Sequence, residues 1–107
     1  MSKIFDINYA SGNITYIEEG LRDDLSISQQ AEILREDLLQ VAFEDDKFIL
    51  DVGWYPEGDE EGSFVIVIVQ DYKWDAPIFR SETKDLYQLR NLLIEAVKVA
   101  KGDVSSG

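Results

Sequence analysis

The chain has 107 residues, 45% of them hydrophobic, and a formal net charge of −12 from 22 acidic and 10 basic residues. This length and composition predict one folded domain over residues 1–102, followed by a frayed tail at 103–107. The absence of cysteine and histidine excludes disulfides, thiolate catalysis, the usual structural zinc sites and the usual neutral-pH general base.

The first half of the chain predicts a hairpin and then an amphipathic helix. Apolar and polar residues alternate over residues 3–9 and again over 14–17, with turn residues between them. Ser26 and Gln29 have the spacing of a capping box, in which each side chain binds the other residue's main-chain N–H. A helix is predicted over 28–43, because apolar residues recur at steps of three and four: Ile27, Ala31, Leu34, Leu38 and Val41.

Three more strands and a second helix are predicted in the second half. Residues 48–55 alternate, and residues 64–69 are apolar on both faces, which fits the most buried strand at the centre of a sheet. Residues 71–79 contain a proline, which favours an edge strand or an irregular extended segment. Apolar residues at helical spacing predict a helix from about Lys84 to Lys101. The resulting order, β-β-α-β-β-β-α, indicates an α+β fold, a mainly antiparallel sheet with two helices packed on it.

The negative charge is concentrated in the first part of the chain. Residues 1–61 hold 16 acids and 4 bases, whereas residues 62–107 hold six of each. Such a directional field attracts cationic partners and repels nucleic acid and anionic lipid, so we expect a basic protein as the partner. The N-terminus has no basic segment followed by an apolar run, and the longest apolar run is too short to cross a bilayer. A cytoplasmic protein is therefore expected.

The acidic loop at residues 57–62 invites comparison with a calcium-binding loop. Its oxygen-bearing side chains stand at alternate positions, and Gly62 stands in the sixth place. The twelfth position, where a calcium loop needs a bidentate acid, is Ile68, inside a predicted strand. A solvated hairpin loop and a partner-binding loop remain the two interpretations, and neither a metal nor a cofactor is expected.

Aromatic residues and one acid in the predicted strands are further candidates. Trp54 alternates with the core residues of its strand, whereas Tyr72 and Trp74 stand among charged residues and are typical of a protein-binding surface. Asp51 interrupts an apolar strand, so it is either solvent-facing or a half-buried acid with a raised pKa. The chain is not expected to be an enzyme, because it has no phosphate loop, nucleophile elbow or histidine pair.

Three features together suggest a family resemblance in this acidic chain. They are the acidic segment Ser28–Phe43 with the acids after it, the loop Glu57–Gly62, and the segment Val65–Arg80 with its Trp74-Asp75-Ala76-Pro77 turn. In these features the chain resembles the immunity proteins of bacterial toxin–immunity systems, including those of contact-dependent growth inhibition. The resemblance implies a protein that binds and blocks a toxin domain delivered by a neighbouring cell. Many such toxins are basic nucleases, which suits an acidic inhibitor.

The sequence leaves three functions open. The chain is expected to cover the active or nucleic-acid-binding site of a basic toxin, or to act as an acidic DNA mimic or adaptor for a basic cellular protein. A small-ligand or enzymatic domain would instead show a deep pocket with a perturbed acid, such as Asp51. The residues expected to contact the partner are Glu44, Asp45, Asp46, Glu57, Asp59, Glu60, Glu61, Tyr72 and Trp74.

Overall fold

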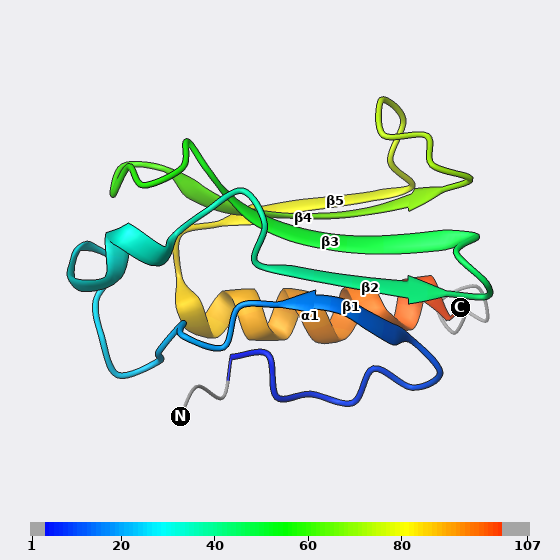
Figure 1. Cartoon of the computed structure of the whole chain (residues 1–107), viewed down its shortest axis with the longest axis horizontal. Coiled ribbons are helices and arrows are strands. Elements are labelled where there is room, and N and C mark those ends of the chain that lie inside the picture. Colours follow the sequence, from blue (N-terminus) through cyan, green and yellow to red (C-terminus); the bar gives the residue numbers. More distant parts are fainter. Residues whose placement is uncertain (1–3, 102–107) are drawn as a thin grey trace.

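The computed structural model describes residues 4–101 and consists of one antiparallel sheet with a long helix against one face (Figure 1). The five strands follow one another across the sheet in chain order, each antiparallel to the next. The α+β class and the antiparallel sheet are confirmed, whereas the predicted tail at 103–107 lies outside the described residues. The elements are β1 (Asn13–Ile17), the 3-10 helix η1 (Ser28–Ile33), β2 (Leu39–Phe43), β3 (Phe48–Tyr55), β4 (Ser63–Gln70), β5 (Phe79–Thr83) and α1 (Leu86–Ala100).

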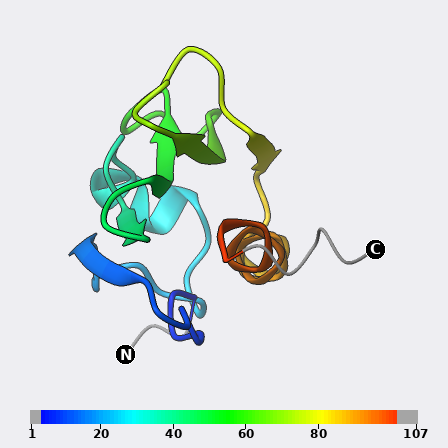
Figure 2. The ribbon, with the colours of Figure 1, turned by 90° about the vertical axis from the view of Figure 1, so that its right-hand side faces the viewer.

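The C-terminal helix α1 forms where it was predicted, and for local reasons. The Asp85 carboxylate accepts hydrogen bonds from the main-chain N–H groups of Tyr87 and Gln88, so it caps the first turn. The apolar stripe faces the sheet, and Figure 2 shows α1 against one face of it. The buried residues of the helix are Leu89, Leu93, Ala96, Val97 and Ala100.

The core lies between α1 and the sheet face that α1 covers. β4 was expected at the sheet centre, but β3 holds that place, and β4 lies between β3 and β5. Ile66 and Ile68 of β4 are fully buried on the helix side, while Val65 and Val67 are only partly buried on the other face. The prediction of a strand buried on both faces thus fails for most of β4, because α1 covers only one face, although Val69 on the outer face is fully buried beside Ile49 and Ala42.

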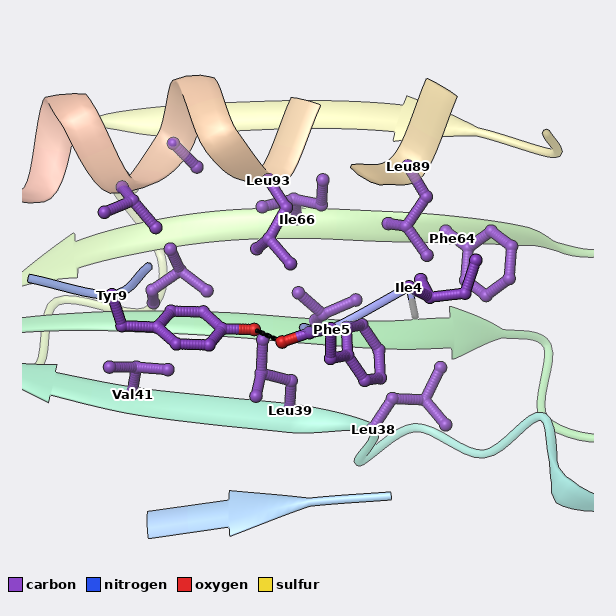
Figure 3. Packing of buried hydrophobic residues seen from close by; sticks show 14 of the residues in the cluster. Ile4, Phe5, Tyr9, Leu38, Leu39, Val41, Phe64, Ile66, Leu89 and Leu93 are labelled. Carbon is purple, nitrogen blue, oxygen red and sulfur yellow. Dashed lines mark hydrogen bonds between the residues drawn. The ribbon is translucent and has the colours of Figure 1, made fainter. Parts of the chain in front are cut away.

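The strand predicted over residues 3–9 is absent from residues 4–9, and Lys3 lies outside the described residues. The segment instead lies over the core face of the sheet, where Phe5 and Tyr9 lie over β3 and its neighbour β2 (Figure 3). It bends back on itself, because the Ile7 N–H and the Tyr9 hydroxyl both donate to the Phe5 carbonyl, at 3.0 and 2.7 Å. Burial raises the pKa of that hydroxyl. The alternating apolar residues of this segment therefore reflect its packing against the core and do not indicate a paired strand.

The helix predicted over 28–43 is wrong beyond its first turns. Ser26 and Gln29 make the reciprocal hydrogen bonds of a capping box, at 2.9 and 3.2 Å. Gln30 then has non-helical torsion angles, and its buried side chain binds the main chain of the preceding loop. Residues 39–43 form strand β2, because alternate positions of this segment also match a strand. The side chains at these alternate positions are buried in the core: Leu39, Val41 and Phe43.

The proline-containing segment predicted over 71–79 divides into a loop and the start of an edge strand. Residues 71–78 form the loop between β4 and β5, and β5 begins only at Phe79. The Ile78 N–H donates to the Ile68 carbonyl at 2.8 Å, which fixes the end of the loop to β4. Of the two predicted alternatives, the irregular segment describes residues 71–78, and the edge strand begins only at Phe79.

Candidate functional site

The two predicted groups of acids lie at opposite ends of the sheet. Glu44, Asp45 and Asp46 form the turn between β2 and β3, whereas the acids of residues 57–61 belong to the loop between β3 and β4. β3 has eight residues, so the two ends are roughly 25 Å apart at about 3.3 Å per residue. The two connections lie on opposite sides of Figure 1. The nine predicted contact residues therefore do not form one continuous surface.

The acidic turn lies beside the loop that carries the predicted aromatic residues. The Asp71 N–H, at the start of that loop, donates to the Lys47 carbonyl at 2.8 Å, which joins the loop to the turn. Glu44, Asp45 and Asp46 have φ angles of 50°, 54° and 72°, in the left-handed region that non-glycine residues rarely adopt. A tight turn of this kind holds three exposed carboxylates in one compact group.

Tyr72 and Trp74 contribute two large exposed rings to the same end of the sheet. Their exposed fractions are 57% and 50%, which is high for side chains of this size. Lost hydration, the negative charge of Asp46 and a hydrogen bond to the Asp46 carboxylate together raise the pKa of the Tyr72 hydroxyl. The acidic turn and the aromatic loop are therefore in direct contact. We call Glu44, Asp45, Asp46, Tyr72 and Trp74 the acid–aromatic end.

The acids in the β3–β4 loop help to hold their own loop in place. The indole N–H of Trp54, a fully buried ring as predicted, donates to the Asp59 carbonyl at 2.7 Å. The Asp59 carboxylate accepts from the Glu61 N–H at 2.8 Å, and the Glu57 carboxylate accepts from the Glu36 N–H at 3.4 Å. All four acids are exposed, and the carboxylates of Asp59 and Glu57 in addition accept hydrogen bonds that hold the loop.

The structure contains a cleft at Asp51, the acid at which the sequence placed the pocket expected of a small-ligand or enzymatic domain. Its volume is about 420 Å³, and Asp51 reaches it on the sheet face away from α1. The only sequence signal for it was an acid within an apolar strand. The other lining residues come from separate elements that only the fold brings together. The lining consists of Tyr16, Arg35, Asp37, Leu39, Gln40, Asp51 and Glu57.

Asp51 is half-buried and belongs to a short hydrogen-bond chain across the sheet. The Gln40 side-chain amide donates to the Asp51 carboxylate at 3.2 Å, and the Thr15 hydroxyl donates to the Gln40 side-chain oxygen at 3.1 Å. Burial raises the pKa of Asp51, the hydrogen bond from Gln40 opposes this shift, and the charge of Asp37 adds to it. Of the two interpretations of Asp51 from sequence, the half-buried acid with a raised pKa is confirmed.

Replacing Asp51 with asparagine is expected to increase the free energy of unfolding at pH 7. The raised pKa means that the native state binds this proton more tightly than the unfolded chain, so ionised Asp51 costs stability at neutral pH. The neutral amide avoids that cost, and its oxygen can still accept from Gln40. The advantage should shrink as the pH falls through the native pKa and vanish below the unfolded pKa, where the wild-type carboxyl is protonated in both states.

Urea unfolding at pH 7 and at pH 3.5–4 measures this difference. Asp75→Asn, at an exposed loop position, changes the net charge equally and corrects for the general effect of charge. An Asp51→Asn variant that is less stable than the wild type at pH 7 would contradict the expected effect.

The acid–aromatic end and the Asp51 cleft are thus the two best-defined candidate sites of the chain. Within residues 4–101, no group of three or more acidic residues is placed to hold a metal ion. The same residues include no helix with the length and apolar character needed to cross a membrane. No protein-family model, curated protein or solved structure matches the chain.

Proposed function

We propose that the chain is a cytoplasmic immunity protein that binds a basic toxin domain, of nuclease type, through its acid–aromatic end. The observation that supports this most strongly is the contact between the acidic turn and the Tyr72–Trp74 loop. Exposed Tyr and Trp rings are typical anchors of protein-binding surfaces, and the acids beside them give charge complementarity to a basic partner. The protein inhibits by occlusion and not by catalysis.

Each part of the acid–aromatic end has a distinct physical role in this proposal. The net charge of −12 speeds the encounter with a basic partner, because long-range attraction orients the two proteins before contact. The three turn carboxylates replace substrate phosphates in the nucleic-acid-binding site of the toxin. Tyr72 and Trp74 supply apolar contact area with few rotatable bonds, so they lose little conformational entropy on binding.

Neutralising the acidic turn is expected to weaken partner binding far more than neutralising the opposite loop. Glu44→Gln, Asp45→Asn and Asp46→Asn together should reduce affinity about 100-fold, or about 2.7 kcal/mol, because basic groups of the partner lose their charge pairs. Asp59→Asn, Glu60→Gln and Glu61→Gln change the net charge by the same three units and should reduce affinity only a few-fold. Calorimetric titration of each variant with the partner, at low salt and at about 0.5 M salt, measures these affinities. The higher salt screens long-range attraction, so the loss that remains there reflects direct contact.

The partner for this titration is the basic toxin domain that the proposal expects to be encoded beside the gene of this chain. Expression of that domain alone should arrest growth, and coexpression with this chain should relieve the arrest. Continued arrest on coexpression would contradict the proposed function. If both triple variants lose little affinity, and by the same amount, the partner must bind at a surface other than the acid–aromatic end. The adaptor function would be supported instead if the neighbouring gene encodes a protein that is not toxic and this chain binds a basic cellular protein.

A further inference from the structure

The first strand of the sheet leaves one of its edges without a partner strand. Within residues 4–101, β1 pairs only with β2, so the other side of β1 is an open edge. The opposite edge strand, β5, carries an exposed ion pair between Arg80 and Glu82, and such charges discourage the addition of a strand. β1 has the sequence Asn-Ile-Thr-Tyr-Ile, with no charged residue among its five. The two edges of the sheet therefore differ in their capacity to accept another strand.

A mainly apolar groove runs beside this open edge. Its volume is about 600 Å³, and it lies between β1 and the irregular N-terminal segment. Phe5 and Ile7 line one side, and Ile14 and Ile17 of β1 line the other. Ile14 is 43% exposed, although isoleucine is usually buried. The groove can therefore take apolar side chains from a strand that pairs with β1.

Among the described residues 4–101, the charged residues that line the groove are all acidic: Asp6, Glu18 and Glu19. The Glu18 carboxylate accepts from the Gly20 N–H at 3.0 Å, which fixes its position near the end of β1. A second copy of the chain would bring a further net charge of −12 to this edge, which disfavours the pairing of two β1 edges. Charge complementarity selects a basic occupant instead.

We propose that the β1 groove binds an extended polypeptide segment in which apolar residues alternate with lysine or arginine. The segment adds to the sheet as a sixth strand. Its main chain pairs with the open edge of β1, and its apolar side chains enter the groove beside Ile14 and Ile17. Its cationic side chains contact Glu18 and Glu19. This surface shares no residue with the acid–aromatic end, so it stands independently of the proposed function.

The probe is an acetylated and amidated heptapeptide in which four lysines alternate with two valines and a central isoleucine. In a titration of the ¹⁵N-labelled chain, the shifted amide signals should lie in residues 5–19, with slower hydrogen exchange at β1. Ile14→Asn should weaken binding about tenfold, because it removes apolar area from the groove without adding charge. Ile94→Asn, which changes an isoleucine 38% exposed on the outer side of α1, should change affinity less than about twofold.

A second peptide keeps the proposal falsifiable if Ile14→Asn destabilises the strand. Proline in place of the central isoleucine preserves the charge but removes a main-chain donor and the extended pairing, and should weaken binding about tenfold. Equal binding of the two peptides, or shifts confined to residues 44–46 and 71–78, would overturn the proposal. Self-association in sedimentation equilibrium that Ile14→Asn abolishes would also overturn it, because the occupant would then be a second copy.

Discussion

Replacing Ile66 with alanine is expected to lower the free energy of unfolding by about 2–5 kcal/mol, a large part of the stability of a domain of this size. Ile66 is fully buried on the helix side of β4 and faces α1 near Leu93 (Figure 3). Truncation removes apolar area from the core and leaves a cavity that strands paired on both sides of β4 cannot close. Urea unfolding followed by circular dichroism measures the loss.

Ile94→Ala is the matched control, because it removes the same atoms from a partly exposed position on α1. Its effect should stay within about 0.5 kcal/mol, as is usual for surface substitutions. A loss below about 1 kcal/mol for Ile66→Ala would contradict the packing of β4 against α1, whatever the control shows.

Gly53→Ala is expected to cost about 3 kcal/mol or more, because the new methyl group has no space. A Cβ at Gly53 would lie 2.1 Å from the Glu36 carbonyl oxygen, a rigid main-chain atom. The main chain is held close here, since the Trp54 N–H donates to the Arg35 carbonyl at 2.8 Å. The methyl group would force the 35–38 segment away from β3 and distort the Asp51 cleft beside it.

Gly58→Ala provides the control for a glycine without such a contact. No atom lies within 4 Å of a Cβ at Gly58, whose φ of 72° favours glycine. This variant should therefore lose only about 1 kcal/mol, the usual cost of placing alanine in the left-handed region. Urea denaturation of both variants tests the difference, and equal losses would show that the 35–38 segment can move away from β3 at little cost.

The candidate sites were predictable in composition but not in arrangement. The acids and the exposed aromatic residues were identifiable because charge and aromatic content are properties of the residues themselves. The contact between Asp46 and Tyr72 was not, because it depends on the pairing of β3 with β4, which brings two connections to one end of the sheet. The sequence singled out Asp51 but not the rest of its cleft for the same reason, since the lining comes from separate segments of the chain.

The sequence by itself determined the elements whose signals are local. The helix at 86–100 follows from its apolar stripe and from the Asp85 cap, and both lie within the segment itself. Strand β3 follows from its alternating pattern, and the burial of Ile66 and Ile68 follows from the apolar run that contains them.

Only the tertiary structure determined the conformation of segments whose apolar pattern is compatible with more than one secondary structure. Residues 39–43 have apolar residues that suit a helical stripe and also a strand, and pairing with β1 and β3 selects the strand. Residues 4–9 alternate like a strand, yet they pack over the core without one. The physical reason is that a helix satisfies its main-chain hydrogen bonds within its own sequence. A strand satisfies them with residues far along the chain, and the periodicity of one segment carries no information about that partner.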